Sequence, residues 1–225
     1  MKHGLILAEQ EDPGFIYLEF GAGRAGLSSF VAAKLIELGN VKNTFLLIDR
    51  DSRRFKLDKH FKEVLKSFRE KMDIADFDLG RFMQVKAEEG AIKGGKLIAI
   101  AKHLCGGATD LALTSMSLQE PALRHGVSIA TCCHHCCDAL TYVNMPYLLK
   151  FFTEEEIKIL PRFSSWAICV HTPANKRRIG FKVKRIIDFG RCLFIEEVLG
   201  LKVTPYQYCD PLKESPENIL LVADK

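Results

Sequence analysis

Short apolar runs alternate with segments of helical periodicity along most of the chain. The runs have the length and the aliphatic and aromatic content of buried strands, and the segments between them repeat apolar residues at the spacing of an amphipathic helix. Strands are predicted at residues 15–20, 44–48, 96–101 and 127–131, with a shorter one at 71–74. Helices are predicted at residues 25–38, 53–68, 109–118, 153–160 and 175–199, the last with an interruption near Gly190. This alternation predicts an α/β domain with a mostly parallel sheet covered on both faces.

Two local patterns refine this prediction. Thr153 and Glu156 have the spacing of a capping box at the start of a helix. The strands predicted at 202–208 and 219–222 have no helical pattern between them, and such a short connection favours an antiparallel hairpin at the edge of the sheet.

A glycine-rich turn follows the first predicted strand. Gly21, Gly23 and Gly26 satisfy the pattern G-x-G-x-x-G between a strand and a helix, which is the context in which such loops bind nucleotide cofactors. Glycine permits the tight turn and lets a ligand approach the backbone. A tight turn that binds nothing is the alternative. We take Gly21, Ala22, Gly23 and Arg24 as candidate cofactor-binding residues.

Three acidic residues bear on which cofactor this loop binds. Glu19 precedes the first glycine by two positions, where a carboxylate opposes a pyrophosphate but suits the ammonium and sulfonium groups of S-adenosylmethionine. Asp49 ends the second strand, where an acid can accept hydrogen bonds from both ribose hydroxyls. Asp73 is a candidate acceptor for an adenine amino group or, equally, an N-cap for the residues after it. Together with the edge hairpin, Glu19 favours S-adenosylmethionine over a nicotinamide cofactor.

Composition narrows the class of protein. The chain has 225 residues, of which 48% are hydrophobic and 27% charged, so it can bury a core and is not expected to be disordered. Its formal net charge of +4 permits a nucleic-acid partner without requiring one. No run approaches the roughly 20 apolar residues that span a bilayer, and we expect no membrane association. Eight cysteines without a secretory signal indicate reduced thiols in an intracellular protein, cytoplasmic or nuclear.

Several segments also match, in order, the motifs of one known family. They are EFGAGR at 19–24, RFK with a following Asp at 54–58, KHLCG-x-ATDLAL at 102–113, CCHH-x-CD at 132–138, SSWA at 164–167, and Y-x-D-P-L at 208–212 with Glu217-Asn218. With these motifs the chain resembles the tRNA 2′-O-methyltransferases that modify the nucleotide at position four of the acceptor stem. The likeness runs from about Glu19 to Val222, and KHLCG and CCHH are far more specific than the glycine loop.

The resemblance implies a Rossmann-like class I methyltransferase fold, S-adenosylmethionine as cofactor and tRNA as substrate. We therefore expect residues 1–225 to form a single methyltransferase domain. In the family, small zinc-binding modules usually precede this domain and long insertions are frequent. Neither pattern occurs in this sequence, so we expect a fragment or a short form, with consequences for tRNA affinity rather than for the fold. The sequence contains no direct signal for the oligomeric state, and a monomer is slightly favoured.

Lys102 and His103 directly follow the strand predicted at 96–101. Ligands in open α/β sheets bind beyond the carboxyl ends of the strands, so both side chains are expected at the crevice. Methylation of a ribose hydroxyl is an in-line displacement in which the enzyme positions the oxygen and accepts its proton. Burial and a positive cofactor favour a neutral Lys102, which we expect to be the base or a positioning group, with His103 assisting. The alternative for Lys102 is an ion pair with a carboxylate such as Asp110.

The run Cys132–Cys137 follows the strand predicted at 127–131. If strand geometry continues, Cys132, His134 and Cys136 face one way and the other three residues face the opposite way. Neither set supplies the four ligands of a closed structural zinc site.

We therefore expect no metal at this run unless Cys105, Cys169 or His171 joins it. The cysteines are expected to act as small packing residues. One or both of His134 and His135 are expected to reach the crevice and contact substrate phosphate or ribose.

Two groups of basic residues are candidates for phosphate contacts. The first follows the second strand and partly belongs to the family motifs. In the second, Arg178, Lys182 and Arg185 share one stripe of the last predicted helix, and a solvated helix face explains that stripe equally well. Phosphate contacts give affinity without sequence selectivity, and duplex RNA is recognised mainly by shape and through its 2′-hydroxyls. The candidate tRNA-binding residues are Arg53, Arg54, Lys56, His134, His135, Arg178 and Lys182.

Three other classes of function stay open on the sequence alone. One is a methyltransferase that acts on another RNA, a protein or a small molecule. The second is a nicotinamide-dependent oxidoreductase, against which Glu19 and the edge hairpin argue. The third is a non-catalytic RNA-binding or zinc-binding module with the same fold.

Overall fold

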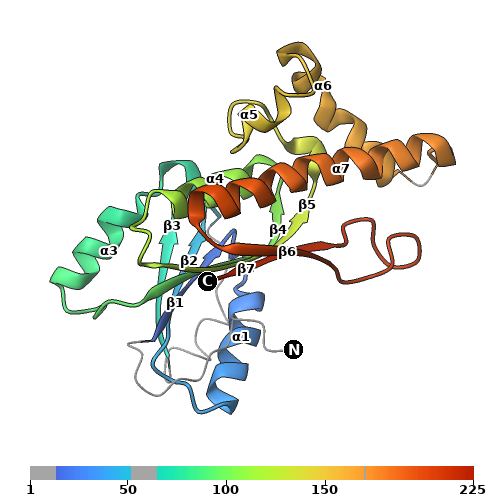
Figure 1. The fold of residues 1–225 in the computed structure, drawn as a ribbon. Helices are drawn as coiled ribbons and strands as arrows, with labels where there is room; N and C mark the ends of the chain where they lie inside the picture. Colours follow the sequence, from blue (N-terminus) through green and yellow to red (C-terminus); the bar gives the residue numbers. More distant parts are fainter. Residues whose placement is uncertain (1–13, 52–64, 170) are drawn as a thin grey trace.

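A seven-stranded sheet is the centre of the computed structural model, which describes residues 14–51, 65–169 and 171–225 (Figure 1). The strand order is β3-β2-β1-β4-β5-β7-β6, and all neighbouring pairs are parallel except β5–β7 and β7–β6. The strands are β1 (Phe15–Phe20), β2 (Thr44–Asp49), β3 (Lys66–Lys71), β4 (Lys96–Cys105), β5 (Arg124–Cys132), β6 (Lys202–Gln207) and β7 (Ile219–Asp224).

Helices cover both faces of this sheet (Figure 1). Helix α1 (Gly26–Glu37) lies on one face, and α3 (Leu79–Glu88), α4 (Gly107–Ser117) and α7 (Ala174–Phe194) lie on the other. Helices α5 (Met145–Leu148) and α6 (Glu154–Ser164) form a further layer outside α7. The short helical turns are η1 (Ile74–Asp76), η2 (His134–Cys136), η3 (Ser165–Ala167) and η4 (Ile195–Leu199).

The alternation of side chains along the central strands explains why they are apolar throughout. Leu18 of β1 pairs with Leu46 and Ala99 on the two sides and faces α3, α4 and α7. The preceding residue, Tyr17, pairs with Phe45 and faces α1. Because both faces are covered, successive residues are all buried and the strand shows no polar alternation.

The predicted α/β domain with a mostly parallel sheet and a C-terminal antiparallel edge pair is confirmed. The capping box is confirmed as well, because Thr153 accepts a hydrogen bond from the Glu156 backbone and Glu156 accepts one in return. In the described ranges, no helix is both long enough and apolar enough to cross a bilayer.

Three predicted element bounds are wrong. The third strand is Lys66–Lys71 and not 71–74, so residues 66–68, predicted as the end of a helix, belong to this strand; the rest of that predicted helix lies mostly outside the described residues. Strand β4 extends four residues beyond Ala101, to Cys105. Helix α7 continues through Gly190 without interruption. This glycine instead makes room for Tyr142, because a Cβ at position 190 would collide with the Tyr142 hydroxyl.

Candidate active site

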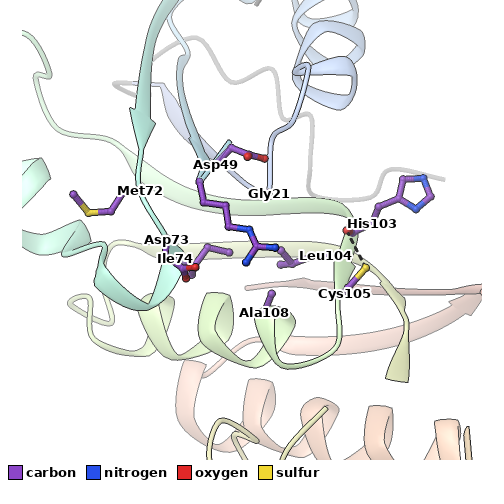
Figure 2. Close-up of a pocket in the computed structure, with 10 residues that line it drawn as sticks. Gly21, Asp49, Met72, Asp73, Ile74, His103, Leu104, Cys105 and Ala108 are labelled. Atoms are coloured by element: carbon purple, nitrogen blue, oxygen red, sulfur yellow. Dashed lines mark hydrogen bonds between the residues drawn. The ribbon is translucent and has the colours of Figure 1, made fainter. Parts of the chain in front are cut away.

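A cavity of about 310 Å³ opens at the carboxyl ends of β1, β2 and β4 (Figure 2). This volume is in the range of small-molecule sites, and the position is where ligands bind in open α/β sheets. His103 and Cys105 lie at one end, and Met72, Asp73 and Ile74 lie at the other (Figure 2). The lining residues are Gly21, Asp49, Arg50, Met72, Asp73, Ile74, His103, Leu104, Cys105 and Ala108.

The glycine loop forms one wall of this cavity. Gly21 has a φ of +67°, a conformation that favours glycine, and a Cβ at this position would make a tight contact of 3.0 Å with the Leu104 side chain. The loop is tied to β2, because the Ala22 amide donates to the Ile48 carbonyl at 3.0 Å. Arg69 of β3 donates to the Gly23 carbonyl at 3.3 Å, a support that the sequence patterns did not indicate.

Asp49 connects the loop to the cavity. Its Oδ2 accepts a hydrogen bond from the Gly23 amide at 2.7 Å, and its Oδ1 accepts one from the Asp51 amide at 2.8 Å. Each carboxylate oxygen has a further lone pair, and the side chain is half-buried on the cavity wall. Asp49 is therefore held in a fixed orientation while it retains acceptor capacity for a ligand.

Asp73 combines the two roles that the sequence left open. Its Oδ1 accepts a hydrogen bond from the Ala75 amide at 3.0 Å and caps η1. The same residue lines the cavity opposite Gly21 (Figure 2).

The other candidate cofactor residues do not line this cavity. Glu19 is buried, and its Oε2 accepts a hydrogen bond from the Ser28 amide at 3.1 Å, at the first turn of α1. This contact holds the start of the helix against β1. Ala22 is buried, Gly23 is half-buried and Arg24 is exposed, and none of the three lines this cavity.

Lys102 and His103 are on β4 and line different cavities, and the His103 ring points away from the other lining residues of its cavity (Figure 2). Lys102 continues the alternation of Ile98 and Ile100 and lines a second, mostly apolar cavity on the α1 face, together with Tyr17. At His103 the backbone has a φ of +62° and the register with β5 shifts. His103 consequently lines the cavity that contains Asp49.

The expected burial of Lys102 is wrong, because its side chain is exposed in the described structure. The alternative ion pair with Asp110 is wrong too. Asp110 is completely buried and pairs with Arg191, whose Nη2 lies 2.6 Å from Asp110 Oδ2.

The run 132–137 does not continue as a strand. Strand β5 ends at Cys132, Cys133 has a φ of +47°, and the turn η2 follows, so the predicted two-sided alternation is wrong. A Cβ at Gly106 would lie 2.5 Å from the Cys136 backbone, so the KHLCG and CCHH motifs meet at this glycine.

His134 is buried in an ionic network and does not reach the cavity, so its predicted substrate contact is wrong. Its Nε2 lies 2.8 Å from Asp188 Oδ1, and Arg191 Nη1 lies 3.2 Å from the same oxygen. The cause is the turn at Cys133, which directs the His134 ring toward α7. His135 is exposed and stays a candidate for substrate contact.

The charges of this network stabilise one another. Burial alone raises the pKa of Asp188, but the charges and hydrogen bonds of His134, Arg191 and Arg185 outweigh it and lower the pKa to about 2. Arg191 also donates to the Gly106 carbonyl at 3.1 Å and to Cys137 Sγ at 3.2 Å. The network thus joins α7 to the segments that carry both specific motifs.

Three thiols lie together at the ends of β4 and β5. The sulfur atoms of Cys105, Cys132 and Cys133 are all within 4.8 Å of one another, although the run alone was not expected to bring neighbouring cysteines together. Burial raises the pKa of Cys133 to about 11 and that of Cys132 further, so these two thiols are protonated at neutral pH. Cys105, one of the three residues that the sequence offered as an additional ligand, is also part of the cavity wall.

Two residues of the second basic group, Arg178 and Lys182, are exposed near the start of α7, as their proposed role requires. Arg178 lines a third cavity with Arg177, Phe181 and Leu212, and Lys182 is exposed one turn further along the helix. Arg185 is half-buried and pairs with Asp188 at 3.3 Å, so it does not share the exposed stripe fully. Arg53, Arg54 and Lys56 lie outside the described residues.

The fold and this site define a class of protein: an α/β protein with a ligand-sized cavity at the carboxyl edge of its sheet, lined by a glycine loop and carboxylates. The sequence model of the family described as methyltransferase TRM13 matches residues 4–177. The chain belongs to this family, and the resemblance found in its motifs is confirmed.

Named relatives match across nearly the whole chain. The tRNA:m(4)X modification enzyme TRM13 of Schizosaccharomyces pombe is 32% identical over 96% of the chain and 63% of its own length. The enzyme of the same name from Vanderwaltozyma polyspora is 31% identical over 97% of the chain and 58% of its own length. The TRM13 homologue of Mus musculus is 27% identical over 94% of the chain and 60% of its own length. The chain therefore spans about three fifths of the length of these relatives.

Proposed function

We propose that the chain is a Rossmann-like class I methyltransferase domain that methylates the ribose 2′-hydroxyl of the nucleotide at position four of a tRNA acceptor stem, with S-adenosylmethionine as methyl donor. The observation that carries the proposal is the meeting of Gly21, Asp49 and His103 in one cavity, in a chain of a methyltransferase family. The names of the relatives, which are tRNA modification enzymes, support tRNA as the substrate.

The cavity fits S-adenosylmethionine in size and in the chemistry of its wall. Asp49 offers oriented carboxylate oxygens at the end of β2, where ribose hydroxyls are bound in nucleotide-binding sheets. Asp73 offers an acceptor and Ile74 an apolar surface at the far end, which suits an adenine ring. When bound, the cofactor supplies an electrophilic methyl group on a sulfonium.

The remaining chemistry is positioning of the hydroxyl and removal of its proton. His103 lines the cavity, and histidine is the side chain that most often serves as a general base. We assign the proton-accepting role to His103. Lys102, exposed on the other side of the same strand, is assigned to position the substrate. The sequence favoured Lys102 as the base with His103 assisting, and we reverse this order because Lys102 is exposed.

The start of α7 is the proposed contact for the tRNA backbone. Arg178 and Lys182 are exposed there, and Arg178 lines a cavity between α7 and the segment that joins β6 to β7. Such contacts orient the duplex without reading its sequence. Recognition of an acceptor stem by shape and 2′-hydroxyls is consistent with this arrangement.

The test is methyl transfer from labelled S-adenosylmethionine to an unmodified tRNA transcript, followed by mass spectrometry of the nucleosides and of the fragments. We expect one 2′-O-methylated nucleotide, at position four. The control is the same transcript with 2′-deoxyribose at position four, which should accept no label. A methyl group on a base, or equal labelling of the deoxy transcript, would contradict the proposal.

A further inference from the structure

The three thiols at the ends of β4 and β5 are brought together by backbone features that are uncommon in strands. Cys105 and Cys132 are paired across the parallel strands, so their side chains leave the sheet at the same level. Cys133 would face the opposite side in a regular strand, but its φ of +47° turns its side chain back toward the other two. A left-handed conformation outside glycine is costly, and such strain tends to occur at functional sites.

The spacing of the sulfur atoms suits a shared metal ion. The Cys105 and Cys132 sulfurs are 3.8 Å apart. Two sulfurs that each bind a tetrahedral zinc at about 2.3 Å lie roughly 3.8 Å from each other, whereas a disulfide requires about 2.05 Å. All eight cysteines of the chain are free thiols in the structure.

The three cysteine sulfurs favour some metal ions over others. Three cysteine sulfurs form a soft donor set that suits zinc and disfavours magnesium or calcium. In the part of the chain that the structure describes, no histidine or carboxylate oxygen joins this group, so the fourth position of a tetrahedral ion is left to a molecule from outside. Three protein ligands and one exchangeable position are typical of zinc sites that take part in binding or catalysis.

The neighbouring contacts hold one ligand in place. Glu217 Oε1 accepts a hydrogen bond from the Cys133 amide at 3.1 Å, and Glu217 Oε2 lies 2.6 Å from Lys184 Nζ. Both partners of this ion pair come from the C-terminal part of the chain, outside the two motifs. Such supporting contacts orient metal ligands and are part of how a site is built.

We propose that Cys105, Cys132 and Cys133 bind one zinc ion, whose open fourth position faces the cavity that Cys105 lines. The ion joins the ends of β4 and β5 beside the proposed cofactor site. The proposal does not depend on the proposed function, because it rests on sulfur geometry alone. It also replaces the expectation of no metal, since Cys105 supplies the additional ligand that the run lacked.

The test is the zinc content of the untagged chain after dialysis, measured by inductively coupled plasma mass spectrometry. We expect about one zinc per chain. Cys105→Ser should lose the metal and still fold, because Cys105 is exposed. Cys136→Ser is the matched control, an exposed cysteine of η2 outside the sulfur cluster, and it should keep the metal. Circular dichroism and the Tm show that both variants are folded.

A second measurement identifies the ligands. Replacement of zinc by Co²⁺ should give intense sulfur-to-cobalt charge-transfer absorption in the wild-type chain, unchanged in Cys136→Ser and absent in Cys105→Ser. The proposal is overturned if the folded wild-type chain binds no zinc on titration, or if folded Cys105→Ser retains a full equivalent. A disulfide between Cys105 and Cys132 in freshly reduced, zinc-supplemented protein would overturn it as well.

Discussion

The Nε2 atom of His134 lies 2.8 Å from Asp188 Oδ1, in the interior between η2 and α7. Asp188 also accepts from Thr131 Oγ1 at 3.1 Å and pairs with Arg191 at 3.2 Å. One buried carboxylate thus fixes a histidine of the CCHH motif, the end of β5 and the arginine that holds Gly106. The histidine that looked like a substrate contact is a structural part of the site.

Asp188→Asn should destabilise the fold substantially. Asparagine keeps the shape of the side chain but leaves Arg191 without one of its two buried carboxylate partners and removes the charge beside His134. Loss of one partner of a buried pair typically costs about 3 kcal/mol. The free energy of unfolding in urea measures this, and Glu197→Gln, an exposed acid near the end of the same helical segment, is the control. Equal stabilities would show that the network contributes little.

The lowered pKa of Asp188 predicts that the protein loses stability at acidic pH. The pKa of Asp188 is lowered from 3.8 to about 2, so between these values the unfolded state binds more protons than the folded state. Stability from this group is therefore present above pH 4 and is lost as the pH falls from about 4 to 2, by about 2 kcal/mol. Urea unfolding at several pH values in this window should show a shallower dependence for Asp188→Asn than for the wild type. Parallel curves would contradict the assignment.

The sequence predicted the sheet well because the apolar runs of β1, β2 and β4 reflect burial on both faces. It missed β3 because Lys66–Lys71 carries polar residues on a half-exposed strand, where the apolar signal is absent. The position of the cavity was predicted from the carboxyl ends of the strands, and Asp49 lies on its wall at the end of β2, as the sequence indicated. The side chain of His134 was misplaced for a different reason. The left-handed residue Cys133 interrupts the expected alternation, and nothing in the identity of that residue marks this conformation.

Asp49→Asn should weaken the binding of S-adenosylhomocysteine at least about tenfold, which is about 1.4 kcal/mol. Asparagine keeps one oxygen to accept from the Gly23 amide, so the loop should persist, but the second oxygen and the charge are lost. Isothermal titration calorimetry measures the affinity. Asp76→Asn, an exposed acid of η1 outside the cavity wall, is the control and should bind like the wild type. An unchanged affinity for Asp49→Asn would place the ribose elsewhere.

His103→Asn should lower kcat for tRNA methylation about 100-fold or more and leave the affinity for S-adenosylhomocysteine nearly unchanged. Asparagine tolerates the φ of +62° at this position, so the strand geometry is kept while the base is removed. Lys102→Ala should act mainly on KM for tRNA, because this side chain faces the neighbouring cavity. Single-turnover rates with saturating tRNA separate the two effects. The opposite result, with kcat lost only in Lys102→Ala, would return the role of base to the lysine.

Replacement of Arg178 and Lys182 by alanine should weaken tRNA binding and lower the salt dependence of the affinity. Each lost phosphate contact reduces the slope of log K against log salt by about 1, so the double variant should lose between about 1 and 2. The matched control is Lys42→Ala with Lys93→Ala, two exposed lysines that precede β2 and β4 and so lie at the opposite edge of the sheet. Binding measured at several salt concentrations should leave the control slope equal to that of the wild type. If the α7 variant also keeps the wild-type slope, this stripe is a solvated helix face and the tRNA backbone contacts another part of the chain.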